Sequence, residues 1–290
     1  MRDLQLPGRS PVITSNGMVS TSQPLSTSAA LTVLKDGGNA MDAALAACAV
    51  QAVVEPASTG IGGDCFCLYA PADSPDIIAI NGSGRAPQAL NTELLLSQGI
   101  TKIEQQSAHS VTVPTAVDAW VQLNRDYGTM PLADLLQPAI GYADDGFPVA
   151  QRSAFDFAGC LALLKGDADA SDVFLKAGQT YQMGEILRQP ALAKTLREIA
   201  EKGRAGFYEG WVADDLLAKL NGLGGLHTAD DLAMARADYV TPISTNFRGY
   251  DIFECPPNRA IHILTDQLDQ TPLDLLGKQL PLFGSRLLKS

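Results

Sequence analysis

The 290-residue sequence lacks a long hydrophobic run. Its longest apolar stretch, residues 43–54, is interrupted by Gln51 and is shorter than the roughly 20 residues that a membrane span needs. Residues 1–17 contain no apolar segment of the length that a signal peptide requires. We therefore expect no membrane partner and a cytoplasmic location.

Basic residues are also scarce. The chain has 21 lysines and arginines against 32 aspartates and glutamates, which gives a net charge of −11, and its basic residues are not clustered. Nucleic acids are bound through a basic face, so the composition excludes a nucleic-acid partner. An acidic surface of this kind favours solubility instead.

Paired cysteines and clustered metal ligands are missing as well. The five cysteines are odd in number and scattered: Cys48, Cys65, Cys67, Cys160 and Cys255. Cys48 lies in an apolar helical pattern, which predicts burial, and Cys65 and Cys67 would share one face of a strand. A zinc site needs two more ligands, and the histidines are distant in sequence. We predict no metal and no cofactor.

The sequence does contain a glycine-rich corner between two helical patterns. A helix from residue 25 is predicted to end at Gly37 and Gly38, because glycine readily adopts the left-handed conformation of a helix end. Asn39 would cap the next helix, which Pro56 ends, and Asp42 would favour its dipole. That helix is apolar almost all round, which indicates burial on most sides. A phosphate loop would follow a strand and contain Gly-Lys-Ser/Thr, so we favour a structural corner.

Strand patterns lie on both sides of a long helical region. We predict short strands within residues 11–22, two more at 65–70 and 77–84, and a final pair with a turn at Arg248-Gly249. Residues 150–220 are mainly helical, and Thr228 followed by Asp231 predicts a helix start. Helices packed on a sheet predict an α/β fold.

Three stretches of the sequence resemble a known protein family. The stretch DGGNAMDAALAACAVQAVVEPASTGIGGDCFCLY is similar to the large-subunit signature of the γ-glutamyltranspeptidases and their acylase-like relatives. Two further blocks, residues 110–149 and 207–258, resemble the same family in the same order. The resemblance therefore covers nearly all of the chain up to Asn258.

The resemblance implies a fold and a chemistry. The family belongs to the N-terminal nucleophile hydrolases, whose four-layer α/β/β/α sandwich is made as one precursor that cuts itself into a large and a small subunit. The small subunit begins with a threonine. Its hydroxyl attacks the γ-glutamyl amide, and its own α-amine serves as the base that a weak nucleophile needs. The expected activity is transfer or hydrolysis of γ-glutamyl amides such as glutathione, or of related acyl amides.

The chain departs from the family pattern at its end. It contains no Thr-Thr-x-x-Ser-like nucleophile segment, and Thr228 and Thr241 match other family positions. We predict a large-subunit region at residues 1–258 with a helical insertion around 150–220, and a divergent tail at 259–290. The sandwich would then be incomplete because the small-subunit strands are missing. We expect no catalytic residue within the chain, and no activity from the chain alone.

Arg85 is the predicted substrate-binding residue. In the family, an arginine three residues before an Ala-Pro pair holds the substrate's α-carboxylate, and a guanidinium suits this role because its planar fork binds carboxylate bidentately. Here that position is Ser83, and Arg85 adjoins Ala86-Pro87 instead. An exposed turn arginine is the alternative interpretation. This variant resembles the acylase-like branch.

The other candidate side chains favour structural roles. His109 and Ser110 would point to opposite faces of a strand, and His227 beside two glycines is expected to be a solvated loop residue. Trp120 and Trp211 lie in helical patterns and are expected to pack in the interior.

Three readings of the function stay open. The first is an enzyme-family protein represented by its large-subunit portion. The second is a catalytically inactive truncated or frameshifted remnant, or a large subunit that needs a separately encoded partner. The third is a small-molecule binding module. A chain without the small-subunit strands would expose apolar sheet faces, which predicts poor solubility or obligate partnering and leaves a homo-oligomer open.

Overall fold

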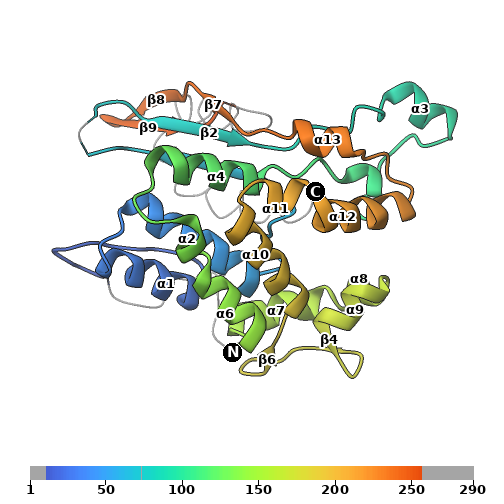
Figure 1. The fold of residues 1–290 in the computed structure, drawn as a ribbon, viewed down its shortest axis with the longest axis horizontal. Coiled ribbons are helices and arrows are strands. Elements are labelled where there is room, and N and C mark those ends of the chain that lie inside the picture. The colour runs from blue at the N-terminus through green and yellow to red at the C-terminus, as the bar shows by residue number, and fades with distance from the viewer. Residues whose placement is uncertain (1–10, 73, 257–290) are drawn as a thin grey trace. The chain divides into compact units, whose positions relative to one another are not determined.

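The computed structural model describes residues 11–72 and 74–256. They belong to two compact units. One unit comprises the chain up to Cys65 together with Gly82–Ala237, and the other comprises Phe66–Asn81 with the chain from Asp238 onward. Most helices lie in the first unit and the longer strands lie in the second (Figure 1).

The first unit is predominantly helical. Its helices are α1 (Pro24–Lys35), α2 (Ala40–Val54), α3 (Thr92–Ser97), a 3₁₀ turn (Ala108–Ser110), α4 (Ala116–Tyr127), α5 (Leu132–Leu135), α6 (Gln137–Asp145), α7 (Gln151–Gly159), α8 (Leu161–Lys165), α9 (Ala168–Phe174), α10 (Pro190–Lys202), α11 (Ala205–Tyr208), α12 (Gly210–Gly222) and α13 (Ala229–Met234). None of the helices in the described part of the chain is long and apolar enough to cross a bilayer.

The corner between α1 and α2 (Pro24–Lys35 and Ala40–Val54) has the predicted form. Gly37 has a φ of 94°, in the left-handed region where glycine carries no steric penalty. The side chain of Asn39 accepts a hydrogen bond from the Asp42 backbone N–H, and the Asp42 carboxylate accepts one from the Asn39 N–H, both at 2.9 Å. This reciprocal capping box confirms the predicted helix start.

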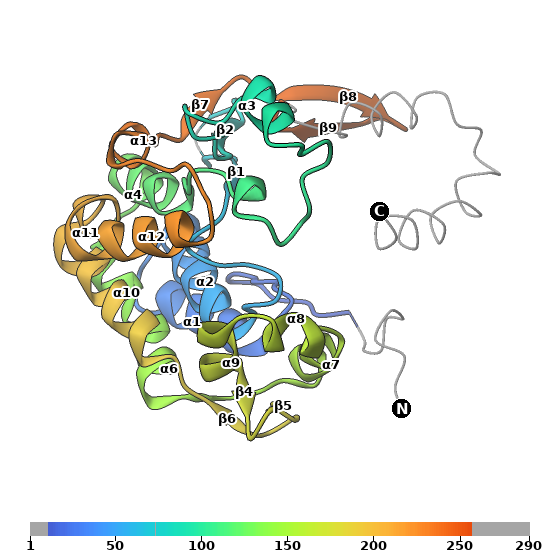
Figure 2. The same ribbon diagram turned by 90° about the vertical axis from the view of Figure 1, so that its right-hand side faces the viewer.

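Helix α2 forms the centre of the core of the first unit. It packs against α1, α4, α5 and α6, as its apolar composition predicts (Figures 1 and 2). The prediction for Cys48 was wrong, because this side chain is exposed. Ala40, Ala44 and Cys48 are spaced four residues apart and form the one stripe of this helix that faces solvent. These three positions carry no polar side chain, so the sequence pattern could not reveal which stripe would be exposed.

Residues 150–220 are mainly helical, as predicted. Helices α7, α8 and α9 group with the short hairpin of β4 (Leu175–Lys176) and β5 (Gln179–Thr180) at one end of the first unit (Figure 2). A second short pair, β3 (Phe147–Pro148) and β6 (Ile186–Leu187), brackets this region in the sequence. That the region is an insertion remains a prediction, as do the domain limits at residues 258 and 259.

The second unit contains the longer strands. Its three-stranded sheet has the order β1 (Cys65–Tyr69), β2 (Ile78–Gly82) and β7 (Asp238–Val240), and β2 pairs antiparallel with β7. The predicted terminal hairpin is confirmed as β8 (Ile243–Phe247) and β9 (Tyr250–Glu254), with positive φ at Arg248 and Gly249 in its turn. Along β1, Phe66 and Leu68 are exposed whereas the two cysteines are half-buried.

The strands predicted for residues 11–22 are absent from the described chain. Residues 11–20 are irregular and mostly exposed, and Ile13 is 94% exposed. A strand needs a neighbour to bond its backbone, and among the described residues no strand pairs with this segment. Local alternation of residue types therefore gave the wrong prediction here.

Candidate functional site

A cavity of about 510 Å³ lies within the first unit. Its lining comes from three segments: the loop that follows β2, the segment that leads into α4, and α13 with the residues after it. The lining residues are Arg85, Ala86, Gln88, Val113, Thr115, Asp231, Met234, Ala235 and Arg236. A volume of this size is typical of a site for a small molecule.

The loop that carries Arg85 is laid closely against the segment leading into α4. The N–H of Val113 donates to the Arg85 carbonyl at 2.9 Å. A Cβ at position 84 would come within 2.1 Å of the Val113 carbonyl oxygen, so only glycine fits there. The Gly84 N–H donates in turn to Asp64 at 3.1 Å. Arg85 is exposed and lines the cavity; its role in substrate binding remains a prediction.

The glycine-rich segment at residues 60–63 helps to hold this loop in place. The Gly63 carbonyl accepts hydrogen bonds from the backbone N–H groups of Thr115 and Ala116, at 3.2 and 3.0 Å. These donors lie at the start of α4, where N–H groups have no partner within the helix. The segment thus fixes the start of a helix and, through Asp64, the loop of Arg85.

Asp231 joins two walls of the cavity. Its carboxylate accepts hydrogen bonds from the Thr228 N–H at 2.9 Å and the Thr228 hydroxyl at 2.7 Å, which confirms the predicted capping box of α13. It also accepts the Gln88 N–H at 3.0 Å. Burial acts to raise the pKa of Asp231, but these hydrogen bonds outweigh burial and hold it below its usual value. The carboxylate is therefore ionised and joins the wall of Gln88 to that of Thr228.

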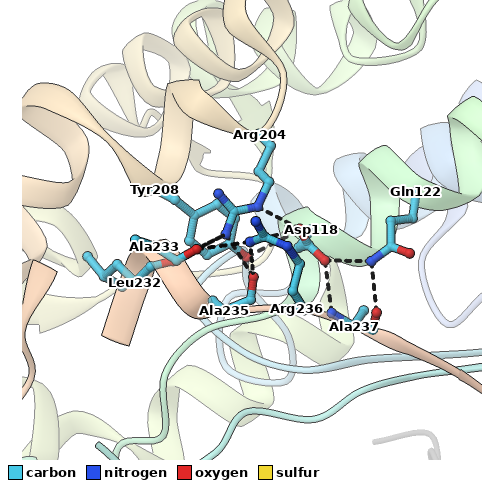
Figure 3. Close-up of polar contacts among 9 residues, drawn as sticks. All are labelled: Asp118, Gln122, Arg204, Tyr208, Leu232, Ala233, Ala235, Arg236 and Ala237. Carbon is cyan, nitrogen blue, oxygen red and sulfur yellow. Dashed lines mark hydrogen bonds and ion pairs between the residues drawn. The ribbon is translucent and has the colours of Figure 1, made fainter. Parts of the chain in front are cut away.

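Behind the cavity, the buried carboxylate of Asp118 organises a polar cluster (Figure 3). Asp118 lies on α4 and accepts hydrogen bonds from Arg204 Nε at 2.7 Å, from the Ala237 N–H at 2.8 Å and from Gln122 Nε2 at 2.7 Å. The backbone N–H of Asp118 donates to the Tyr208 hydroxyl at 3.1 Å. One side chain thus connects α4 with the segments around residues 204 and 237.

Arg204 closes the C-terminal end of α13. Its Nη2 group donates to the carbonyls of Leu232, Ala233 and Ala235, at 3.2, 3.1 and 2.7 Å (Figure 3). The last carbonyls of a helix have no intrahelical donor, and a cation there also suits the helix dipole. Arg204 lies over the ring of Tyr208, 4.4 Å from its centroid, and burial raises the pKa of that phenol. Arg204 therefore shapes the cavity wall without lining the cavity.

His227 is not the solvated residue that we predicted. Only 2% of it is exposed, and its Nε2 lies 3.0 Å from the Val111 carbonyl. Its Nδ1 has no hydrogen-bond partner within the described residues. Burial lowers the pKa of His227, so the ring is neutral and structural. The two glycines before it predicted an exposed loop, but the packing of the folded chain buries this residue.

Thr115 lies at the cavity and is buried, so its chemistry matters for the expected mechanism. Its hydroxyl donates to the Gly82 carbonyl and its backbone N–H donates to the Gly63 carbonyl. An amide nitrogen within the chain is not a free α-amine, so it cannot act as the base for this hydroxyl. Thr115 therefore holds the site together and lacks the equipment of an N-terminal nucleophile.

Sequence reasoning identified one lining residue as functional and missed the rest of the arrangement. Arg85 was chosen by resemblance and Asp231 only as a helix cap. Asp118, Arg204 and Arg236 carried no signal, because Asp118 meets each of the two arginines across 86 or more residues of sequence. His109 is part of a 3₁₀ turn and not of a strand, and it does not line the cavity.

Comparisons with known proteins agree with this architecture. The family model described as gamma-glutamyltranspeptidase matches residues 26–272. The glutathione hydrolase-like YwrD proenzyme of Bacillus subtilis is 37% identical over 248 residues, which are 85% of this chain and 47% of the relative. The chain thus spans about half the length of the curated relatives it matches.

Solved structures show the same likeness. A cephalosporin acylase from Bacillus halodurans is 40% identical with a TM-score of 0.82, over 88% of this chain and 49% of that one. The γ-glutamyltranspeptidase of Helicobacter pylori is 31% identical with a TM-score of 0.81, over 86% of this chain and 72% of that one. They confirm the expected α/β fold class of the N-terminal nucleophile hydrolases and the likeness to the acylase-like branch. The chain belongs to the γ-glutamyltranspeptidase family.

Proposed function

We propose that this chain is the large-subunit portion of an enzyme that transfers or hydrolyses γ-glutamyl amides such as glutathione, or related acyl amides. The observation that carries the proposal is the position of Arg85 on the lining of a cavity that the family-like segments build together. The relatives named as a glutathione hydrolase-like proenzyme and a cephalosporin acylase support an amide as the substrate.

In this proposal Arg85 binds the carboxylate of the substrate. A guanidinium offers two parallel N–H donors that match the two carboxylate oxygens. The close packing of Gly84 on Val113 fixes the backbone from which Arg85 projects. A lysine at this position would keep the charge but lose the paired geometry.

The nucleophile would be a threonine at the start of a small-subunit portion. Its hydroxyl oxygen forms a bond to the amide carbon while its own α-amine takes the hydroxyl proton. That proton then passes to the leaving nitrogen as the carbon–nitrogen bond breaks. Water or an acceptor amine next displaces the threonine from the acyl group. No residue of the cavity lining is needed as the nucleophile.

The first experiment measures the pure 290-residue chain on a γ-glutamyl anilide. We expect no release of the aniline. Turnover by the chain alone would overturn the assignment of the nucleophile to a small-subunit portion.

A gain-of-function test complements the measurement on the chain alone. Residues 1–258 are joined to the second half of the Bacillus subtilis relative and produced as one precursor. We expect self-cleavage into two fragments and turnover of the anilide. Alanine in place of the first residue of the second fragment is the control and should abolish both. A fused protein that folds and cleaves itself but never turns over an amide would favour the inactive alternative.

A further inference from the structure

The lining of the cavity is cationic. Arg85 and Arg236 both contribute to it, from the loop after β2 and from the segment after α13. Among the described residues of this lining Asp231 is the acidic one, and it is already engaged by Thr228 and by the Gln88 N–H. A ligand in this cavity therefore meets two guanidinium groups, and a carboxylate that already accepts three hydrogen bonds from the protein.

The two arginines near Asp118 differ in how many of their guanidinium N–H groups remain without a hydrogen bond. Arg204 is 20% exposed, and both its Nε and its Nη2 groups are used by Asp118 and by carbonyls of the α13 end. The side chain of Arg236 is 52% exposed, and only its Nη1 group is bound, to the carbonyls of Ala233 and Ala235 at 3.0 and 2.6 Å. Within the described residues its Nε and Nη2 groups make no hydrogen bond.

The anchoring of Arg236 keeps its guanidinium at the cavity. Its Nη1 group lies 4.0 Å from the Asp118 carboxylate and is held by two carbonyls, so the side chain has lost much of its freedom before any ligand arrives. A guanidinium fixed along one edge with N–H groups left over is suited to binding a carboxylate. Arg204 and Asp118 are positioning residues for this group, because they hold the backbone from which Arg236 projects.

We propose that Arg236 binds a second carboxylate of the ligand, so that the cavity selects ligands with two carboxylate groups over ligands with one. The second half of this statement rests on the proposed role of Arg85 for the first carboxylate. A cavity of about 510 Å³ has room for a five-carbon dicarboxylate. Each additional carboxylate–guanidinium pair at a partly exposed site is expected to strengthen binding by about tenfold.

The test uses a matched ligand series on the complete chain. Glutarate, glutaramate and glutaramide have the same carbon skeleton and carry two, one and no carboxylates. Their affinities are measured by titration calorimetry at low ionic strength, because salt weakens such contacts. We expect glutarate to bind about tenfold more tightly than glutaramate. Equal affinities for these two compounds would overturn the proposal.

Variants then assign the second carboxylate to its residue. Arg236→Gln should lower the affinity for glutarate to that for glutaramate while changing glutaramate binding by no more than about twofold, since one carboxylate can still use Arg85. Arg236→Lys keeps the charge but not the fork and should give an intermediate preference. A preference for glutarate that survives in both variants would overturn the proposal.

Two controls separate the possible failures. Arg152→Gln removes an exposed arginine that pairs with Asp156 on α7, away from the lining, and should change nothing. Melting temperatures of all variants show whether the fold is kept, and the lysine variant, which retains the cation, carries the test if the glutamine variant unfolds. If Arg85→Gln leaves the binding of both acids unchanged, the proposed role of Arg85 fails, whereas the loss in Arg236→Gln still reports on Arg236.

Discussion

The corner between α1 and α2 and the cluster behind the cavity each contain a fully buried carboxylate that joins distant segments, but they neutralise it differently. Asp42 accepts hydrogen bonds from Asn39, Thr129 and Met130, all of them uncharged donors. Asp118 is paired with Arg204, which in turn bonds the end of α13. The corner thus depends on uncharged donors alone, whereas the cluster combines the uncharged donors of Gln122 and Ala237 with a close ion pair to Arg204.

This difference indicates at which buried carboxylate a substitution should destabilise the molecule most. Removing a buried carboxylate that faces neutral donors leaves several N–H groups unpaired, at about 1–3 kcal/mol for each group that water cannot reach. Removing one that faces a cation leaves a charge without its counterion, which costs more. The cluster also shapes the cavity, so a defect there should reach the site.

The largest effect is expected for Asp118→Ala. The substitution removes the ion-pair partner of Arg204 and the acceptor of the Ala237 N–H. Breaking a largely buried ion pair typically lowers the free energy of unfolding by about 3–5 kcal/mol. Urea unfolding followed by circular dichroism measures the loss. Asp144→Asn is the control, because that carboxylate pairs with Arg197 on the surface and should cost less than about 1 kcal/mol. Similar losses in the two variants would show that the cluster is not the sensitive point.

Asp42→Asn should cost less, about 2 kcal/mol. The amide keeps one acceptor oxygen but turns an NH₂ group toward donors such as the Thr129 N–H and hydroxyl. The same urea titration checks it. A loss larger than that of Asp118→Ala would reverse the comparison between the corner and the cluster.

The helix caps of the two regions give a smaller effect. Thr228→Ala removes the side chain that accepts the Asp231 N–H and donates to its carboxylate, which should cost about 1 kcal/mol. Because Asp231 also holds the Gln88 N–H, we expect a weaker glutarate affinity along with the stability loss. Asn39→Ala, the equivalent change at the corner, should lower stability without touching glutarate binding. Equal effects on binding would contradict the separation of the two regions.

Acidification is expected to give the smallest difference in stability between the two regions. Burial holds the pKa of His227 below 6.5, so between the folded and unfolded values the unfolded chain binds more protons, and stability falls as pH drops below about 6.5. Asp42 behaves differently: burial raises its pKa, but hydrogen bonds led by that of Thr129 outweigh burial and hold it below 3.8, so its contribution is lost only at lower pH. Urea midpoints between pH 7.5 and 5 should decline in the wild type and less in His227→Gln. Parallel declines would exclude His227 as the cause.

The sequence was informative where a structure depends on neighbouring residues. The Gly37 turn, the Asn39 cap, the Thr228 capping box and the terminal hairpin each involve residues a few positions apart, and all were predicted. The family and fold class followed from three ordered blocks. The cluster could not be predicted, because Asp118, Arg204 and Arg236 meet only after folding.

The errors have the same origin. Residues 11–22 have strand-like composition but no neighbouring strand among the described residues, and His227 follows a loop signal into a buried position. Cys48 lies on an apolar helix whose exposed stripe has no polar residue to mark it. In each case the outcome depends on packing by distant parts of the chain, which local patterns do not contain.

Helix α13 has six residues, too few to persist by its own backbone bonding in water. Thr228 holds its first turn, and Arg204, which lies 28 or more positions before the carbonyls it binds, holds its last turn. Its amide protons should therefore exchange with deuterium in step with those around Arg204, and not at the rate of an independent short helix. The wall that carries Arg236 is therefore expected to unfold and refold as part of a larger cooperative element that includes the residues around Arg204.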